Sequence, residues 1–129
     1  MKPSAALRHL DRAQQECVSQ YVALLAERLG EELLEVWLFG SAARGDMWSE
    51  RMPFHSDIDL LVLTRTPVAR SDIEELGNQT YPLFLKCGRQ IAPQFKTMSG
   101  FGAPKDERTR EFFDRVRAEG VVLLQRPST

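Results

Sequence analysis

Two aspartates at the start of an apolar segment are the residues of this sequence best suited to chemistry. Asp57 and Asp59 flank Ile58 in the segment 57–63, whose other residues are apolar. If this segment is a strand, its period of two places both carboxylates on one face, about 6.5 to 7 Å apart along the chain. Repulsion and desolvation disfavour two acids beside a buried strand, and a divalent cation offsets both effects. The pair therefore predicts a site for Mg²⁺ or Mn²⁺, which usually take further ligands from substrate phosphates.

A Gly-Ser pair and an arginine precede the aspartates and have the chemistry to bind phosphate. Gly40 lets the backbone approach a ligand closely, and Ser41 offers a hydroxyl and a backbone N–H where a helix is expected to start. Arg44 follows one turn later and can place its guanidinium over the same phosphates. Gly40, Ser41 and Arg44 are therefore candidate ligands for a triphosphate.

Each of these features has a simpler explanation when it is taken alone. A Gly-Ser turn after a strand is common, and an Asp-x-Asp at the start of a strand is more often a cap or a solvated pair. Arg44 and Asp46 can also form a surface ion pair. The combination of all three features on consecutive segments is much more specific than any one of them.

The apolar pattern predicts the elements that position these residues. Apolar residues recur every three or four positions over residues 5–29, which predicts an amphipathic helix that Gly30 can end. Residues 33–39 are short and mostly apolar and predict a buried strand. Residues 47–55 show no repeating pattern and predict a loop, after which residues 57–63 form the second strand.

Helices and strands continue to alternate in the second half of the chain. Ser71 and Glu74 match a capping box at the start of a helix that reaches Gly88, and Pro82 should kink or interrupt it. The remaining expected elements are a strand over 90–97 with Pro93 at a sheet edge or bulge, a loop over 99–104, a helix over 106–119 and a strand over 121–124. This order indicates an α/β (α+β) fold in which helices pack on a small mixed sheet.

Composition and charge argue against several classes of protein. The 129 residues include 17 basic and 18 acidic side chains, and the resulting net charge of −1 gives no argument for a nucleic-acid partner. No window approaches the roughly 20 apolar residues that span a bilayer. Cys17 and Cys87 have neither zinc-site nor disulfide-framework spacing, so we expect two reduced thiols. We expect residues 1–129 to form a single cytoplasmic domain that binds no membrane.

The segments 38–46 (LFGSAARGD) and 56–62 (SDIDLLV) resemble the minimal nucleotidyltransferases of the DNA polymerase beta superfamily. The similarity covers most of the chain, but these motifs give it its specificity. The resemblance implies the nucleotidyltransferase fold, with Gly40 and Ser41 at the nucleotide phosphates and Asp57 and Asp59 as catalytic metal ligands. It also implies ATP or another nucleoside triphosphate as substrate and Mg²⁺ or Mn²⁺ as cofactor.

The resemblance also implies a protein partner. Members of this family are often encoded beside a HEPN-domain protein, and many such pairs resemble toxin–antitoxin modules in which the nucleotidyltransferase adenylylates the toxin. By this resemblance, the chain is an antitoxin that transfers AMP from ATP to a hydroxyl of a HEPN-type partner. Two alternatives stay open: a catalytically weak module that neutralises its partner by complex formation, and an adenylyltransferase that modifies a small molecule. A homodimer is compatible with any of them.

The sequence departs from the family pattern by lacking a third carboxylate. Active members of the superfamily carry this group on a neighbouring strand, where it shares a metal and helps to deprotonate the attacking hydroxyl. Here that strand is expected over residues 90–97, which contain neither Asp nor Glu. Ala92 and Gln94 share one face of it, and a glutamine cannot act as a base. Catalysis by this chain therefore requires a direct test.

The interval between the two motifs is a second departure. Fifteen residues separate Ser41 from Asp57, more than in the shorter family pattern, and residues 48–55 are the apparent insertion. Its Trp48 and Phe54 could stack on a base or bind a partner, although aromatic residues of this kind more often pack a loop onto its domain. His55 could touch substrate, although a lone loop histidine is more often a surface residue.

Overall fold

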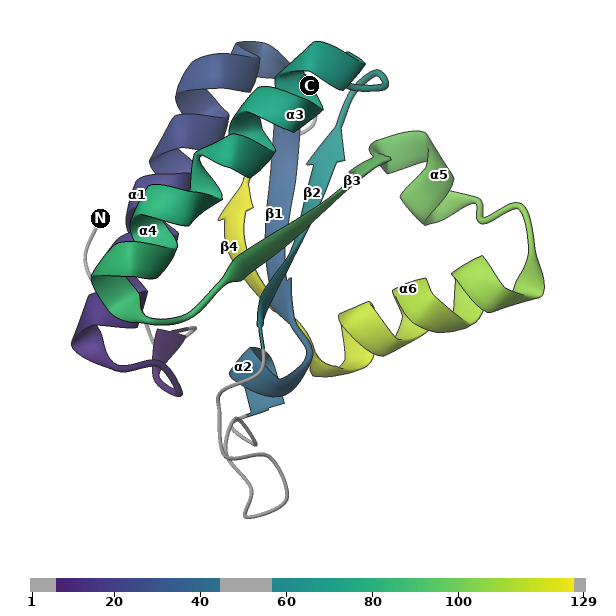
Figure 1. Ribbon diagram of the computed structural model, residues 1–129. Helices are drawn as coiled ribbons and strands as arrows, with labels where there is room; N and C mark the ends of the chain where they lie inside the picture. The colour runs from purple at the N-terminus through teal and green to yellow at the C-terminus, as the bar shows by residue number, and fades with distance from the viewer. Residues whose placement is uncertain (1–6, 45–56, 127–129) are drawn as a thin grey trace.

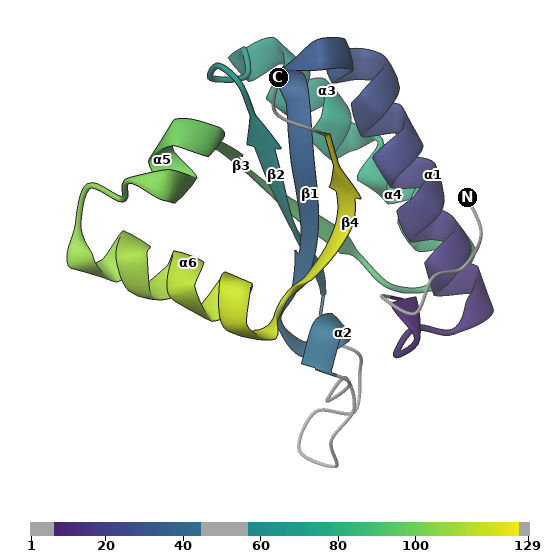
Figure 2. The ribbon, with the colours of Figure 1, turned by 180° about the vertical axis from the view of Figure 1, so that it is seen from behind.

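Helices cover both faces of a four-stranded mixed sheet in the computed structural model, which describes residues 7–44 and 57–126 (Figures 1 and 2). The elements in chain order are α1 (Arg12–Leu29), the 3₁₀ helix η2 (Gly30–Glu32), β1 (Leu33–Phe39), α2 (Ser41–Arg44), β2 (Ile58–Thr64), α3 (Arg70–Asn78), α4 (Thr80–Cys87), β3 (Ile91–Thr97), α5 (Met98–Gly102), α6 (Glu107–Glu119) and β4 (Val121–Gln125). The expected small mixed sheet with packed helices is thus confirmed.

The strands lie in the order β3-β2-β1-β4. β1 runs antiparallel to both β2 and β4, whereas β2 and β3 run parallel and are joined through α3 and α4. β3 is an edge strand, which explains how Pro93, with no N–H to donate, is tolerated in it. The expectation that Pro93 lies at a sheet edge is confirmed.

The side chains of β2 alternate between two hydrophobic clusters on opposite faces of the sheet. Ile58, Leu60 and Val62 belong to the cluster that includes the apolar residues of α1 and α4. Leu61 and Leu63 pack with the aromatic side chains of α5 and α6 on the other face. Figure 1 shows this division, with α1, α3 and α4 on one side of the sheet and α5 and α6 on the other. By its parity, Asp59 shares the α5–α6 face.

The first helix is shorter than its apolar pattern predicts. Asp11 is the N-cap of α1 and accepts a hydrogen bond from the backbone N–H of Gln14 at 2.7 Å. The Gln14 side chain bonds back to the N-cap backbone and completes a capping box. Leu7 and Leu10, which we expected within the helix, precede it and are nevertheless buried. The helix ends at Gly30 as expected, with a φ of +58°. No helix in the described ranges is both long and apolar enough to cross a membrane.

The helix expected to continue to Gly88 is two helices. α3 ends at Asn78 and α4 begins at Thr80, so Pro82 lies in the first turn of α4, where its missing N–H leaves no helical bond unmade. The expected capping box of Ser71 and Glu74 is wrong, because the N-cap of α3 is Ala69, two residues before Ser71, and it makes no side-chain bond. The backbone of Ala69 is extended, so Ser71 already lies within the first turn of the helix.

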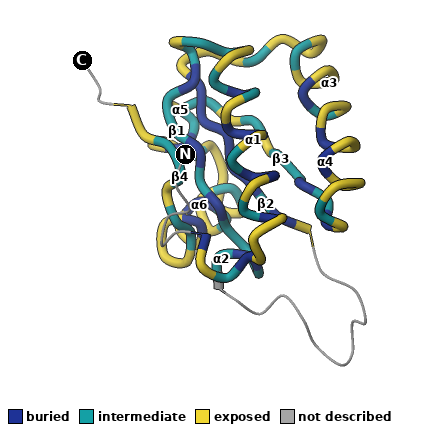
Figure 3. Tube along the Cα trace, turned by 90° about the vertical axis from the view of Figure 1, so that its left-hand side faces the viewer, coloured by how far each residue is buried: buried dark blue, intermediate teal, exposed yellow. Residues whose placement is uncertain are grey.

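The C-terminal elements agree with the sequence except for one added helix. Asp106 caps α6 by accepting a hydrogen bond from the Thr109 N–H at 2.7 Å. The region expected as a loop contains α5, because Thr97 caps its first turn by accepting from the Gly100 N–H at 3.1 Å. Phe101 of α5 is buried against α6, and this packing stabilises a segment rich in glycine. Figure 3 shows that the buried residues are concentrated in the sheet and on the sides of the helices that face it.

Candidate metal and nucleotide site

The end of β1 and the start of β2 bring four of the sequence-predicted residues together. The two strands are antiparallel, and Phe39 at the end of β1 lies opposite Asp59. Gly40 and Ser41 follow Phe39 directly, and Asp57 immediately precedes β2. Asp57 is exposed and Asp59 is half-buried, so both carboxylates can be reached by a ligand. The site lies at the end of the sheet beside α2 (Figure 1).

Gly40 has a conformation and an environment that other residues would disturb. Its φ is +73°, a region that residues with a Cβ adopt at a cost. A Cβ built at this position would lie 2.6 Å from Oδ2 of Asp59, which is closer than real contacts allow. The sequence explains Gly40 by the approach of a ligand, whereas in the structure the group that approaches Gly40 is the Asp59 carboxylate.

The turn after Gly40 continues as the short helix α2. The backbone N–H of Ala43 donates to the Gly40 carbonyl at 3.1 Å, and Ala42 is buried in the core. This anchors Ser41 at the first position of α2. The structure describes only the backbone of Arg44, so its contact with phosphate stays a prediction. Asp46 and the insertion with Trp48 and His55 lie outside the described residues.

The two aspartates have the donors that a divalent cation requires. Mg²⁺ is commonly held by one or two carboxylates and completes its shell with water and substrate phosphates. Asp57 and Asp59 supply two such carboxylates at an accessible end of the sheet, so they fit Mg²⁺ or Mn²⁺ with phosphate ligands. No group of three or more His, Cys, Asp or Glu side chains suited to a metal occurs in the described part of the chain.

The neighbouring strand β3 contains neither Asp nor Glu. Ala92 lies opposite Asp59, and Gln94 lies opposite Leu61, in the parallel pairing of β2 with β3. Partners in this register lie on the same face of the sheet, so the position nearest to Asp59 on β3 has a methyl side chain. In this register β3 therefore offers no carboxylate to Asp59.

Arg89 is a charged residue near the aspartates that sequence analysis did not find. It lies between α4 and β3, its side chain is 1% exposed, and its Nη2 donates to the backbone carbonyl of Asp57 at 3.5 Å. Burial lowers the pKa of Arg89, whereas the negative charges of Asp59 and then Asp57 act to raise it. The sequence offered one signal for Arg89: a charged residue stands directly before the strand expected over residues 90–97.

A hollow of about 200 Å³ opens beside Asp59. Its walls come from the end of β1, the start of β2 and α6, and consist of Phe39, Gly40, Asp59, Phe112, Arg115, Val116 and Glu119. The rings of Phe39 and Phe112 meet edge to face with centroids 5.3 Å apart, which fixes α6 against the end of β1. The sequence indicated α6 only as a packed helix, yet it also brings a guanidinium and a carboxylate to the edge of the candidate site.

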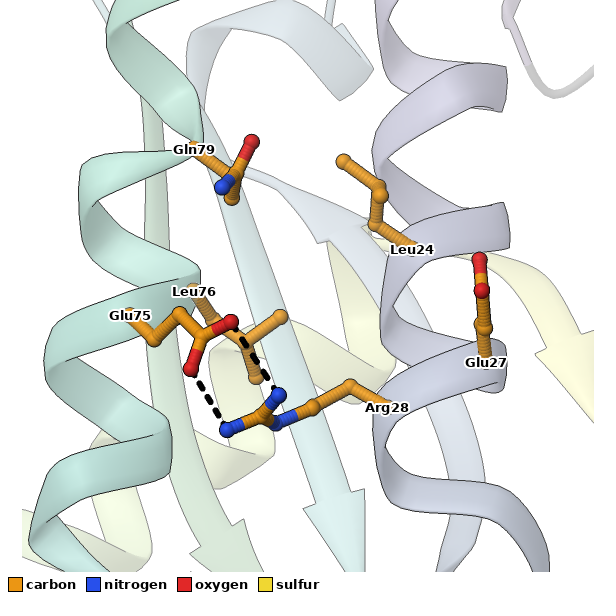
Figure 4. Close-up of a pocket in the computed structure, with 6 residues that line it drawn as sticks. All are labelled: Leu24, Glu27, Arg28, Glu75, Leu76 and Gln79. Carbon is orange, nitrogen blue, oxygen red and sulfur yellow. Dashed lines mark hydrogen bonds and ion pairs between the residues drawn. The ribbon is translucent and has the colours of Figure 1, made fainter.

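A second hollow, of about 330 Å³, lies between α1 and the α3–α4 pair. Figure 4 shows its cation, Arg28, directed toward Glu75. Arg28 Nη2 lies 2.5 Å from Glu75 Oε2, and Arg28 Nε lies 3.0 Å from Asp72 Oδ1. Because two carboxylates already neutralise this arginine, the hollow is a poor site for phosphate, and it contains none of the sequence-predicted residues.

Comparison with known families identifies the chain. The model of a nucleotidyltransferase domain family matches residues 19–118. This range contains both motifs and the strands β1, β2 and β3. The chain belongs to this nucleotidyltransferase family. No curated protein shows a significant match in sequence. The resemblance drawn from residues 38–46 and 56–62 is therefore confirmed at the level of the family.

Solved structures share the nucleotidyltransferase fold at low sequence identity. A complex of a tri-AMPylated HEPN toxin with its MNT antitoxin from Shewanella oneidensis matches at a TM-score of 0.53 and 18% identity, over 88% of this chain and 73% of that one. A toxin–antitoxin structure with AMP-PNP matches at 0.54 and 18%, over 83% and 73%. Spectinomycin adenyltransferase AAD(9) from Enterococcus faecialis, with ATP and spectinomycin, matches at 0.62 and 17%, over 88% and 56%.

We predict that Gly40→Ala damages the site beyond its effect on stability. The φ of +73° should reduce the free energy of unfolding by about 1 to 2 kcal/mol, and the new methyl group should also displace the Asp59 carboxylate. Mn²⁺ affinity, measured by titration, should therefore fall at least about tenfold, the equivalent of roughly 1.4 kcal/mol.

Gly30→Ala is the matched control, because Gly30 also has a positive φ but has no heavy atom within 4 Å of a built Cβ. It should lose stability and retain Mn²⁺ affinity. Equal Mn²⁺ affinities of the two variants would show that the contact between Gly40 and Asp59 has no part in metal binding.

Proposed function

We propose that this protein is a metal-dependent nucleotidyltransferase that transfers AMP from ATP to a hydroxyl on a HEPN-type partner protein and acts as its antitoxin. The observation that carries the proposal is the close approach of Gly40 and Asp59, where β1 ends beside the start of β2. It supports a site in which the Gly40-Ser41 turn binds phosphate next to a metal held by the aspartates. We further propose that residues 1–129 act as one cytoplasmic domain.

In this proposal each residue of the site has a separate task. Asp57 and Asp59 hold Mg²⁺ or Mn²⁺, which would neutralise charge on the triphosphate. Gly40, Ser41 and Arg44 orient the phosphates. The acceptor oxygen bonds to the α-phosphorus as the bond to the β-phosphate oxygen breaks, so pyrophosphate leaves and the hydroxyl proton passes to water or to an aspartate.

The descriptions of the structural neighbours support the choice of nucleotide and partner. One neighbouring structure is a complex of a tri-AMPylated HEPN toxin with an MNT antitoxin. Another contains AMP-PNP, and AAD(9) contains ATP. These proteins have under 20% identity to this chain, so we use them to choose the first substrates to test: ATP as the donor and a HEPN-type protein as the acceptor.

Nucleotide binding should depend on the aspartates. Titration calorimetry with a non-hydrolysable ATP analogue and Mg²⁺ should show binding by the wild type and at least about tenfold weaker binding by the Asp57→Asn, Asp59→Asn double variant, because the lost carboxylates no longer hold the metal. With labelled ATP, only the wild type should transfer AMP to the HEPN-type partner.

The Asp72→Asn variant is a suitable control, because Asp72 is an acid paired with Arg28 on the α3 side of the molecule. It should bind and transfer like the wild type. Tight nucleotide binding without AMP transfer to any partner would contradict the proposed reaction, and absence of nucleotide binding would contradict the site itself.

A second candidate function is neutralisation of the partner by complex formation alone. The observation that favours it is the methyl side chain of Ala92 opposite Asp59, where an active site would place a third carboxylate. In this case the Asp57→Asn, Asp59→Asn variant would still neutralise the partner. Neutralisation that is lost while the complex still forms would exclude this candidate.

Installing the missing carboxylate should separate the two functions. Neighbouring strands lie about 4.8 Å apart, so the new side chain of Ala92→Asp should reach the cation held by Asp59. We predict that Ala92→Asp transfers AMP at least about tenfold faster than the wild type. This is a modest expectation, because a general base typically contributes more than tenfold to a rate. Transfer is measured at saturating ATP and Mn²⁺.

Gln94→Asp is the matched control for Ala92→Asp. Gln94 lies on the same face of β3 but opposite Leu61, one pleat away from Asp59. Its substitution should therefore change transfer much less. A wild-type rate that equals or exceeds that of Ala92→Asp would show that the site is already complete without a carboxylate on β3.

A further inference from the structure

Arg89 is a charge buried in the core beside the candidate site. It is 1% exposed and is the largest fully buried side chain in the described part of the chain. No buried side-chain nitrogen or oxygen among the described residues lacks a hydrogen-bond partner, so the buried guanidinium nitrogens are all bonded. A fully buried arginine is rare unless counter-charges lie close by.

The segment that carries the two aspartates lies against Arg89. Burial is the largest influence on the pKa of Arg89 and lowers it, whereas the negative charge of Asp59, and then that of Asp57, acts to raise it. The guanidinium also donates to the Asp57 carbonyl at 3.5 Å. Arg89 thus interacts with both the charge and the backbone of the segment that holds the two aspartates.

The backbone around Arg89 is fixed on both sides. The Cys87 thiol donates to the Arg89 carbonyl at 3.3 Å, and the backbone N–H of Ile58 donates to the Gln90 carbonyl at 2.8 Å. The second bond joins the start of β2 to the start of β3. Arg89 therefore has a defined position relative to Asp57 and Asp59 before any cation binds.

We infer that Arg89 is the resident counter-ion of the aspartate pair, and that it positions Asp57 and Asp59 for the incoming metal. Arginine suits this role because it stays protonated and its planar group makes several bonds in a fixed geometry. The guanidinium offsets the repulsion of the two carboxylates and holds the Asp57 backbone. Because Arg89 is 1% exposed, its side chain cannot reach a substrate bound at the surface, so it acts through the aspartates and is a positioning residue.

A double-mutant cycle in EDTA tests the inference without any metal or nucleotide. Arg89→Met keeps the volume and removes the charge, and its melting temperature is compared in the wild type and in the Asp57→Asn, Asp59→Asn background. In the wild type the loss should be roughly 10 °C or more, because the carboxylates lose a buried partner. In the neutral background Arg89→Met should have little effect or raise the melting temperature, because there the buried charge has lost its main counter-ions.

Conservative and remote variants complete the experiment. Arg89→Lys keeps the charge and should retain more of the melting temperature than Arg89→Met does. Arg28→Met removes an arginine from the exposed pair with Asp72 and Glu75, and it should cause the same small loss in both backgrounds. If Arg89→Met folds only in the neutral background, that result also supports the inference.

Equal losses for Arg89→Met in both backgrounds, or failure to fold in both, would overturn the inference and leave Arg89 as a packing residue. The inference rests on the proposed function in one respect only, which is that Asp57 and Asp59 bind a metal. Because the cycle is measured in EDTA, coupling between Arg89 and the aspartates can be found even if the protein transfers no nucleotide. The two proposals can therefore fail separately.

Discussion

The structure depends on holding two carboxylates at the end of a strand whose other side chains are buried. Asp57 and Asp59 stand at the start of β2, and residues 60–64 are all buried. Like charges beside an apolar core are costly unless something of opposite charge lies near them. Arg89 provides such a charge from within the core, and a divalent cation with its phosphate ligands would provide one from solvent. The need to balance these two negative charges explains why Arg89 is buried beside the aspartates and why a cation suits the site.

The sheet gives the site its geometry. The alternation of β2 between two hydrophobic clusters fixes its register, because a shift of one residue would move Asp59 to the α1–α4 face and leucines to the site. Antiparallel pairing then brings Gly40 to the Asp59 carboxylate, where only a glycine leaves room. Parallel pairing brings Ala92 of the edge strand to the same place.

Local chemistry explains what the sequence could predict. The strand Leu33–Phe39 and the edge position of Pro93 follow from apolar period and residue type, and the grouping of Gly40 and Ser41 with the aspartates in one site follows from the motifs. The start of α1 and the break between α3 and α4 did not, because caps and loop geometry decide helix ends. Arg89, Phe112 and Arg115 were not found because they reach the site through tertiary packing, which has no spacing signal in the chain.

The most direct test of the central claim is a crystal of the protein with Mn²⁺ and a non-hydrolysable ATP analogue, examined by anomalous scattering at the manganese edge. We expect an anomalous peak for a manganese ion bound by the carboxylates of Asp57 and Asp59, with the triphosphate beside Gly40 and Ser41. A bound nucleotide whose manganese lies away from both aspartates, or a crystal with no peak at this end of the sheet at saturating Mn²⁺, would contradict the proposed site.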